Sequence, residues 1–271
     1  MIIDGRAIAK QIKERIREEK VGTPTVVAVI LGENPASESY LRMLEKTCES
    51  TGFGYRRVDL DSETTEETLI KEIQALNASA SVDGILIQMP LPKHIDEKKV
   101  LMAVDPMKDV DGFNPINAGR LFKGEKAIPP CTPLAVMTIL EASGIDVAGK
   151  HVVIIGRSNI VGKPLAIMML QKNATVTICH SKTVDLKRHT LSADIVVAAV
   201  GVPEFLKADM ICEGAVVIDV GTNEVDGKLV GDVDFAAVSE KASAITPVPG
   251  GVGPVTNAVL LRNVLTRQRE G

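Results

Sequence analysis

The sequence predicts an α/β protein of two domains, in which helices cover parallel sheets. Three observations support this prediction. Strands alternate with helices over roughly the first 110 residues, a strand runs through a glycine turn into a helix at 151–164, and a polar stretch at 106–133 separates two such series. Alternating strands and helices favour parallel pairing, because each helix returns the chain to the same end of the sheet. A length of 271 residues fits one large or two modest domains.

The first series begins with a helix, in which Ile8, Ile12 and Ile16 recur at helical spacing. Apolar runs bounded by proline and glycine predict the elements that follow. In order, these are a strand at 24–32, a helix at 37–50, a strand at 55–60, a helix at 65–78 and a strand at 83–92.

The second series begins with a helix at 131–144, for which Thr132 is the expected N-cap and Pro133 the first helical residue. The elements expected next are a strand at 151–156, a helix at 161–172 and strands at 174–179, 194–201 and 215–221. Apolar residues at helical spacing from Pro254 onward predict a C-terminal helix, which can return to pack on the first domain.

Composition narrows the class of protein. A net charge of -4 and a pI near 5.7 argue against a nucleic-acid-binding surface. No apolar run approaches the ~20 residues of a membrane span, and the charged N-terminal helix does not resemble a secretory signal. Four scattered cysteines without a C-x-x-C pair predict reduced thiols and no metal site. We therefore expect a cytoplasmic protein that binds neither nucleic acid nor membranes.

The segment from His151 to Pro164 is the most informative in the chain. A buried strand ends at Gly156, and a helix opens at Gly162, so backbone N–H groups and a helix N-terminus point at one place. The turn departs from the dinucleotide fingerprint G-x-G-x-x-G. It carries Arg157 and Ser158 instead, a cation and a hydroxyl that suit a phosphate dianion.

The end of the next strand indicates which coenzyme is bound. NAD sites normally place an acid there to accept hydrogen bonds from the ribose, but this strand ends in His180-Ser181-Lys182. Arg157, Ser158 and Ser181 therefore favour NADP. The alternative is that Arg157 caps a loop and Ser181 forms a turn. Glycines after two later strands, Gly201 and Gly221 before Thr222, either admit a flat ring or mark ordinary turns.

Four further segments carry candidate site residues. Ser37, Tyr40 and Leu44 recur on one face of a helix, where Tyr40 forms a stacking surface or part of the core. Gln88 ends an apolar strand at the edge where α/β ligands bind. Asp111 follows Asp109 in a turn, and paired acids there either act on a ligand or form a solvated turn. The loop Thr246–Thr256 has a stiff, bare backbone, with Pro249, Gly250, Gly251 and Gly253 among its residues.

Together these segments resemble the methylenetetrahydrofolate dehydrogenase/methenyltetrahydrofolate cyclohydrolase family. The motifs, in chain order, are ENPASxxY, QxPLP, KDVDG, IPPCTP, GRSxIVGxP, CHSKT, GDVD and TPVPGGVGPVT. The resemblance implies a homodimer and, in each chain, two domains with a cleft between them. One is a folate domain at 1–118, completed by a helix at 254–271, and the other is a Rossmann-like NADP-binding domain at 119–253.

The resemblance also implies the roles of particular residues. Tetrahydrofolate derivatives would bind Ser37, Tyr40, Gln88, Asp111, Pro249, Gly250, Gly251 and Gly253, with Tyr40, Gln88 and Asp111 as catalytic residues. NADP would bind Gly156, Arg157, Ser158, Ser181, Gly201 and Thr222. The expected activity is oxidation of 5,10-methylenetetrahydrofolate, followed by hydrolysis of the methenyl product to 10-formyltetrahydrofolate in one-carbon metabolism.

One residue departs from the family's pattern Y-x-x-x-K. Leu44 occupies the lysine position, and Lys46 and Arg42 each lie about 200° around the helix from it. We therefore expect intact hydride transfer and weakened hydrolysis, with Tyr40 acting through water as a substitute and Lys46 as a poorer one. The alternatives are a dehydrogenase without cyclohydrolase activity, a shikimate dehydrogenase-like oxidoreductase, and a non-catalytic folate or nucleotide sensor.

Overall fold

The computed structural model describes residues 1–32 and 35–268, and its contacts divide the chain into two units. The first, which we call the three-strand unit, is formed by residues 11–131 and by the chain from Asn257 onward. The second, the five-strand unit, is formed by residues 1–10 and 132–256. Both contain parallel sheets and helices, which confirms the predicted two-domain α/β class. The domain boundary expected at residue 118 stays a prediction.

Two helices, one near each end of the chain, contribute residues to both units. Helix α1 (Gly5–Glu19) and helix α10 (Val252–Gln268) each cross a division between them. Both confirm helices predicted from apolar spacing.

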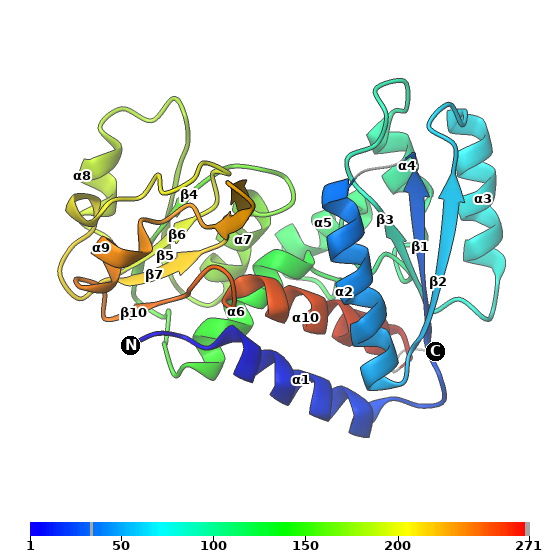
Figure 1. Cartoon of the computed structure of the whole chain (residues 1–271), viewed down its shortest axis with the longest axis horizontal. Coiled ribbons are helices and arrows are strands. Elements are labelled where there is room, and N and C mark those ends of the chain that lie inside the picture. The colour runs from blue at the N-terminus through cyan, green and yellow to red at the C-terminus, as the bar shows by residue number, and fades with distance from the viewer. Residues whose placement is uncertain (33–34, 269–271) are drawn as a thin grey trace. The chain divides into compact units, whose positions relative to one another are not determined.

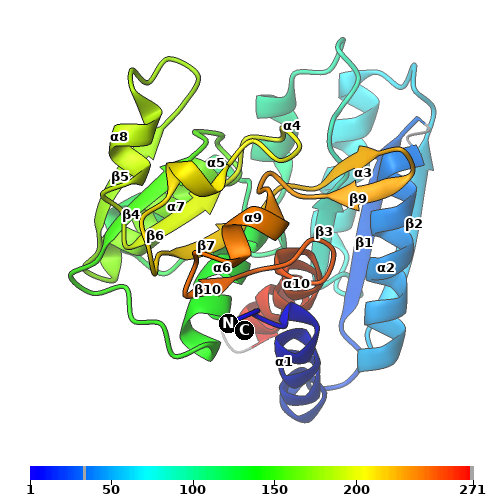
Figure 2. The ribbon, with the colours of Figure 1, turned by 60° about the vertical axis from the view of Figure 1, so that its left-hand side comes forward.

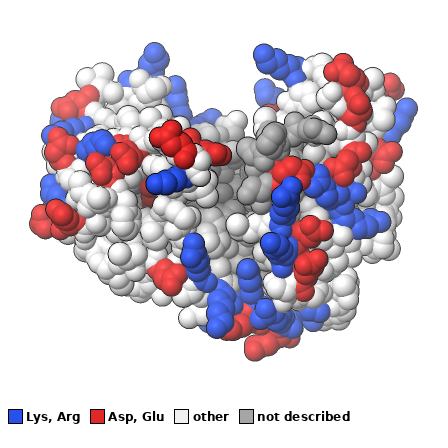
Figure 3. All heavy atoms as spheres, viewed as in Figure 1, with Lys and Arg blue, Asp and Glu red and all other residues white. Residues whose placement is uncertain are grey.

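The surface carries charges of both signs. Acidic and basic side chains are both spread over the face shown in Figure 3, including the surface of α1. Among the residues that the structure describes, no helix is long and apolar enough to cross a membrane.

The three-strand unit alternates strands and helices, as the first series predicts (Figure 1). Its elements are β1 (Thr25–Leu31), α2 (Pro35–Thr51), β2 (Gly54–Leu60), α3 (Glu66–Ala78), β3 (Gly84–Ile87), α4 (Glu97–Ala103) and α5 (Pro115–Lys123). The strand order is β2-β1-β3, all parallel. Its core joins Val27 and Val29 of β1 to Leu69 and Ile73 of α3.

Two differences from the predicted elements have clear causes. Strand β3 ends at Ile87 and not at Pro92, because Pro90 and Pro92 have no N–H to donate to a neighbouring strand. Helix α5 lies inside the stretch expected to be a separator. Its signals were present in the sequence: Asn114 caps it through the N–H of Ile116, Pro115 is its first residue, and Gly124 ends it in the left-handed conformation.

The five-strand unit contains the second series and several short elements that the sequence did not predict (Figure 2). Its elements are α6 (Cys131–Ala142), β4 (His151–Ile155), α7 (Gly162–Gln171), β5 (Thr175–Cys179), α8 (Leu186–Thr190), β6 (Ile195–Ala198), the 3-10 helix η1 (Ala208–Met210), β7 (Val216–Asp219), β8 (Asn223–Val225), β9 (Lys228–Val230), α9 (Phe235–Ser239) and β10 (Ala244–Ile245). Helix α6 already begins at Cys131, so Thr132 lies inside the first turn and is not the N-cap.

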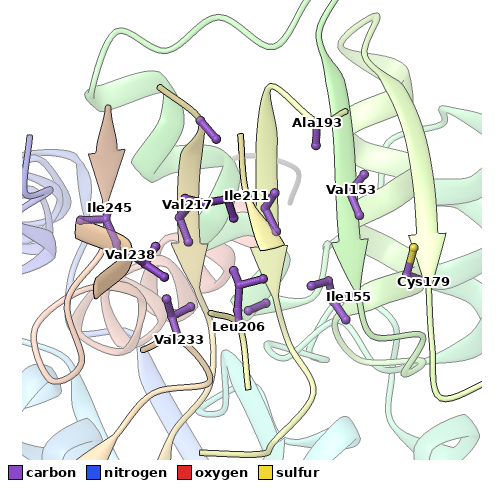
Figure 4. Close-up of a cluster of buried hydrophobic side chains, with 13 residues drawn as sticks. Val153, Ile155, Cys179, Ala193, Leu206, Ile211, Val217, Val233, Val238 and Ile245 are labelled. Atoms are coloured by element: carbon purple, nitrogen blue, oxygen red, sulfur yellow. The ribbon is translucent and has the colours of Figure 1, made fainter. Parts of the chain in front are cut away.

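The sheet of the five-strand unit has the order β10-β7-β6-β4-β5, and each pairing is parallel. Figure 4 shows buried side chains of this unit, where Val153 and Ile155 of β4 lie beside Cys179 of β5, while Val217 of β7 lies on the far side of β6. Strands β8 and β9 form a separate antiparallel hairpin. Burial on both faces explains why β4, β6 and β7 are continuous apolar runs in the sequence.

Candidate functional site

The three-strand sheet reverses its direction of winding beside β1. Strand β1 lies between β2 and β3, and ligands of open α/β sheets bind beyond the carboxyl ends of the strands at such a point. Gln88 directly follows β3, and its Nε2 donates to the carbonyl oxygen of Met89 at 2.8 Å. Its Oε1 is buried and has no hydrogen-bond partner among the described residues. A buried acceptor without a partner fits a ligand that donates a hydrogen bond.

Asp111 reaches the same edge of this sheet. The segment before it runs parallel to β3 through a bridge between Ile85 and Asp109, in which the Ile85 N–H donates to the Lys108 carbonyl at 2.6 Å. Asp111 lies two residues after Asp109, and Ile87 lies two residues after Ile85. Because the two segments run in the same direction, Asp111 lies level with Ile87. The backbone therefore brings Asp111 to the level at which Gln88 begins.

The two acids of this turn differ in their surroundings. The buried carboxylate of Asp109 accepts backbone N–H groups from Phe113 at 3.2 Å and Asn114 at 2.8 Å, and the Asn117 side-chain amide at 3.0 Å. Asp109 is thus saturated by its own turn. This result separates the pair that the sequence left open: Asp109 holds the turn, and Asp111 remains able to meet a ligand.

Asp111 has an unusual electrostatic environment. Burial, followed by the charge of Asp109, raises the pKa of Asp111 to about 7, while a hydrogen bond with the Cys131 thiol acts in the opposite direction. Burial and then the charge of Asp111 raise the pKa of Tyr40 well above its usual range. Tyr40 therefore keeps its proton at neutral pH and is available as a donor. The structure therefore places the Asp111 carboxyl group, with its raised pKa, close enough to the Tyr40 phenol for its charge to raise the pKa of the phenol.

Leu44 lies one helical turn after Tyr40 in α2, and its side chain is 0% exposed. The two nearby cations, Arg42 and Lys46, are both exposed. The face that carries Tyr40 and Leu44 is therefore apolar one turn beyond the phenol, and neither cation lies on it. Ser37 belongs to the first turn of α2, but its side chain lies outside the part of the chain that the structure describes.

Cys131 and Asn263 were not singled out from the sequence. The Cys131 thiol donates to the Val110 carbonyl at 3.1 Å. Asn263 of α10 donates its side-chain amide to the same carbonyl at 2.9 Å and to that of Pro129 at 3.1 Å. These bonds tie the C-terminal helix to the residue before Asp111. No local pattern could have revealed them, because the partners are far apart in the sequence.

The five-strand sheet has the same kind of reversal beside β4, which lies between β5 and β6. Gly156 follows β4, and its backbone is packed so closely that a Cβ there would overlap the carbonyl of Ala199. A Cβ on Gly162 would likewise overlap the carbonyl of Gly156. Both glycines are therefore required by the tight turn that leads into α7.

The side chains of this turn face outward. Arg157 and Ser158 are exposed, and the Ser158 hydroxyl accepts the N–H groups of Val161 at 3.1 Å and Gly162 at 3.4 Å. Ser158 thus shapes the entry to α7 and still has its own hydrogen to donate. Ser181 is exposed in the turn after β5, the strand paired with β4.

The residues around this turn suit a phosphate group. Because β4 and β5 are parallel neighbours, the Arg157 and Ser181 turns lie at the same edge of the sheet. No acidic residue occurs between Asp146 and Asp185, a segment that includes Arg157, Lys163 and Lys182. A guanidinium, hydroxyls and a glycine turn, in a stretch of sequence without acids, form a donor set that fits a phosphorylated nucleotide.

Glycines elsewhere at the candidate sites play different parts. Gly201, after β6, has a φ of 68° and open space where a Cβ would lie. In the loop after β10, a Cβ on Gly251 would lie 2.6 Å from the Pro247 carbonyl oxygen, so this glycine is required by packing. A Cβ on Gly253 would meet nothing within 4 Å. Pro249 and Gly250 belong to the same loop, and Thr222 is exposed after β7.

A surface pocket of about 380 Å³ in the five-strand unit lies away from these residues. It is lined by the end of α6, by the loop that precedes β4 and by Lys172. This position is at the amino ends of the strands, whereas ligands of open α/β sheets bind at the carboxyl ends. We therefore assign it no part in the candidate site.

Comparison with known proteins agrees with both units. Residues 3–111 match the model of the tetrahydrofolate dehydrogenase/cyclohydrolase catalytic domain, and residues 130–270 match the NAD(P)-binding domain of the same family. The chain belongs to the tetrahydrofolate dehydrogenase/cyclohydrolase family. This membership confirms the resemblance drawn from the motifs, and it does not favour the shikimate dehydrogenase-like or sensor alternatives.

Individual members of the family cover the whole chain. The bifunctional protein FolD 2 of Geobacter sulfurreducens is 54% identical over 271 residues, which is 97% of this chain and 95% of that protein. The crystal structure of the bifunctional FolD enzyme from Campylobacter jejuni is 45% identical with a TM-score of 0.97, covering 100% of this chain and 99% of that one. The Trypanosoma brucei enzyme, solved with NADP and an inhibitor, is 40% identical with a TM-score of 0.94, covering 100% and 97%.

Proposed function

We propose that this protein oxidises 5,10-methylenetetrahydrofolate to the methenyl form with NADP and then hydrolyses the product to 10-formyltetrahydrofolate. Membership of a family with bifunctional relatives supports this proposal. The observation that carries it is the pairing of Asp111, whose pKa is raised to about 7, with the protonated phenol of Tyr40. The unpaired acceptor of Gln88 lies at the same edge of the sheet.

The oxidation requires alignment more than proton transfer. Bound NADP supplies the hydride acceptor. The substrate carbon that loses hydride becomes a cation stabilised by its two flanking nitrogens, so no side chain has to move a proton in this step. Asp111 in its ionised form balances that charge, while Tyr40 and Gln88 hold the plane of the pterin ring. Such positioning alone contributes several kcal/mol.

The proposed preference for NADP rests on Arg157, Ser158 and Ser181. The first two follow β4, and Ser181 follows β5, so all three belong to one edge of the sheet. The 2′-phosphate of NADP would meet a guanidinium and hydroxyls there, in a segment free of acids. Charge-assisted hydrogen bonds of this kind are roughly twice as strong as neutral ones.

We propose that hydrolysis is the slower of the two reactions. It needs a group that takes a proton from water and returns one to nitrogen, which is typically worth ~10²–10⁴-fold. Leu44 is fully buried beside Tyr40 and cannot ionise, and Lys46 is exposed on another side of α2. Tyr40, acting through a water molecule, is the remaining candidate, and its raised pKa makes it a better donor than base.

The test is a comparison of Leu44→Lys with Leu44→Met, a matched control that keeps the site apolar. We expect Leu44→Lys to raise cyclohydrolase turnover by about 10²-fold, the typical size of general acid–base assistance. Both reactions are followed by absorbance, and unfolding by denaturant identifies any loss of stability. If Leu44→Lys folds and its hydrolysis is no faster than that of the unmodified chain, the explanation based on the lysine fails. NADP binding without NADPH formation in the unmodified chain would instead favour a sensor.

We further propose that the protein is a homodimer that uses the edge of the five-strand sheet. Strand β5 ends the sheet, and its Ile178 is 37% exposed. Exposed apolar edge strands pair readily with another chain. Ile178→Lys should give a monomer in light-scattering measurements, while Val184→Lys, on an exposed turn, should leave the dimer intact. A monomeric unmodified protein at micromolar concentration would overturn this proposal.

We also propose that the protein works in the cytoplasm. Its four cysteines, Cys48, Cys131, Cys179 and Cys212, are all free thiols, and three of them are buried. Free thiols persist in reducing compartments. Localisation of a fluorescently tagged full-length chain tests the proposal, and a signal confined to the cell envelope would contradict it.

A further inference from the structure

The side chain of Asp232 is 0% exposed and is surrounded by donors of hydrogen bonds. Its Oδ2 accepts the backbone N–H groups of Val200 at 2.6 Å and Gly201 at 2.9 Å. Its Oδ1 accepts the N–H of Val202 at 3.0 Å and the side-chain amide of Asn223 at 3.0 Å. Successive N–H groups of this kind form an anion-binding concavity, and here the chain fills it with its own carboxylate.

A second buried carboxylate holds Asp232 in turn. Asp219, the last residue of β7, is 3% exposed, and its Oδ1 accepts the N–H groups of Gly221 and Asp232, both at 2.9 Å. Its Oδ2 accepts the N–H of Val233 at 3.0 Å. The two carboxylates therefore connect the end of β7, the segment after the β8–β9 hairpin and the loop after β6 through hydrogen bonds from backbone N–H groups.

Two glycines make room for these carboxylates. A Cβ on Gly221 would overlap Oδ1 of Asp232, and a Cβ on Gly231 would overlap Oδ2 of Asp219. Gly221 is therefore explained by the contact with Asp232, and not by the approach of a flat ring. Gly201 differs, because a Cβ there would meet nothing within 4 Å.

The loops that Asp232 joins are those that carry two expected coenzyme residues. Gly201 follows β6 and Thr222 follows β7, and both are exposed at the carboxyl ends of adjacent parallel strands. Asp232 accepts a hydrogen bond from Gly201 itself and one from Asn223, the neighbour of Thr222. One buried side chain thus sets the positions of both loops.

We propose that Asp232 is a positioning residue for the coenzyme: it holds the loops after β6 and β7 in the conformation that binds NADP. The proposal rests on the proposed function, because that function supplies the ligand. Asp232 itself is fully buried and acts only through the backbone that it binds. Its four partners are all donors, so an amide in its place would turn an NH₂ group toward two of them.

The experiment is calorimetric titration of the full-length protein with NADP alone, which requires no catalysis. Asp232→Asn is compared with Asp234→Asn, a matched control whose carboxylate accepts a hydrogen bond from the exposed Lys207 at 3.1 Å. We expect Asp232→Asn to raise the dissociation constant of NADP by about 10–100-fold, the range for hydrogen bonds to charged groups. Asp234→Asn should change it by less than about twofold. Tetrahydrofolate affinity should not change in either variant.

Two further variants test the same role by changing neighbours of Asp232 and not Asp232 itself. Gly221→Ala keeps the charge of Asp232 but displaces the carboxylate, so it should weaken NADP binding in the same direction. Asn223→Ala removes a single donor and should weaken it by only a few fold. These two variants carry the test if Asp232→Asn does not fold.

The outcomes separate the two proposals. Normal NADP binding by folded Asp232→Asn, or by folded Gly221→Ala and Asn223→Ala, would overturn the role of Asp232. An equal loss of NADP and tetrahydrofolate affinity would do the same, because it would indicate general damage. If the unmodified protein does not bind NADP, the proposed function itself fails.

Discussion

The three-strand and five-strand sheets share a winding pattern and differ in where they place charge. In each, the first strand lies between the second and the third, which creates a ligand edge beside β1 and beside β4. At the first edge, the carboxyl group of Asp111 is partly buried and its pKa is raised to about 7. At the second, Arg157 is exposed, while the acids Asp219 and Asp232 are turned inward to backbone N–H groups.

This difference agrees with the different requirements of the substrate and of the coenzyme phosphate. A group that balances a developing charge works best in a site of low polarity, where its interaction with the substrate is strong. A phosphate dianion needs a cation, hydroxyls and backbone donors, and it tolerates no uncompensated acid nearby. The inward-facing acids of the five-strand unit shape its backbone without adding negative charge to the surface.

The largest expected effect comes from Asp111→Asn. Loss of a charged hydrogen bond should lower kcat/KM for methylenetetrahydrofolate by about 10–100-fold. In the unmodified protein the carboxylate is needed in its ionised form, so kcat/KM should fall about tenfold for each pH unit below 7. This inflection should vanish in Asp111→Asn. This is measured by steady-state kinetics between pH 5.5 and 9, a range that extends to both sides of the Asp111 pKa of about 7.

Asp61→Asn, which removes an exposed carboxylate in a turn, is the matched control and should keep both the rate and the pH profile. NADP affinity should stay unchanged in Asp111→Asn if the two edges are chemically independent. A pH profile that keeps its inflection without Asp111 would break the assignment.

An effect of similar size is expected for Arg157→Ala, on coenzyme selection. We expect NADP affinity to fall by about 10–100-fold and NAD affinity to change little, because only NADP carries the additional phosphate. Lys172→Ala removes an exposed cation at the end of α7 and serves as the control. Calorimetric titration with each coenzyme checks this. Equal losses for NADP and NAD would mean that Arg157 does not contact the 2′-phosphate.

Two glycine substitutions distinguish a glycine that is required by close packing from one that has open space beside it. Gly156→Ala forces a Cβ against the Ala199 carbonyl and should destabilise the fold by about 1–3 kcal/mol. Gly253→Ala meets nothing within 4 Å, lies in the first turn of α10 and should stabilise by up to about 1 kcal/mol. Denaturant unfolding measures both. Weaker tetrahydrofolate binding by a stable Gly253→Ala would support a ligand beside it, and unchanged binding would count against that.

The last prediction concerns the dependence of stability on pH. Burial raises the pKa of Asp219 to about 6, above its value in the unfolded chain. The folded state therefore binds more protons, and this contribution is present below about pH 4 and lost as the pH rises through about 6. Between pH 4 and 7, the unfolding free energy of Asp219→Asn should lack this decline, which is about 1–3 kcal/mol. Identical slopes for the variant and the unmodified chain would contradict the prediction.

The sequence by itself determined the alternation of strands and helices, the tight turn after β4 and the family. These are local properties: apolar runs mark β1 and β4, and a glycine turn with Arg157 marks the strand-to-helix connection. The order of motifs along the chain then identified the family without any knowledge of contacts. Comparison of the sequence with the family's pattern Y-x-x-x-K then showed Leu44 at the position of the lysine.

Only the tertiary structure decided which acids face a ligand and which hold the backbone. Asp109 and Asp111 look alike in the sequence, as do Asp232 and Asp234. In the structure, Asp109 is bound by donors of its own turn, and Asp232 by backbone donors from the loop after β6. In the sequence, Gly221 suggested either the approach of a flat ring or an ordinary turn, and in the structure the Asp232 carboxylate occupies the space where its Cβ would lie. The reason is physical: the role of an acid depends on the hydrogen-bond donors that the folded chain places around it, and for Asp232 these donors come from a loop about 30 residues earlier in the chain.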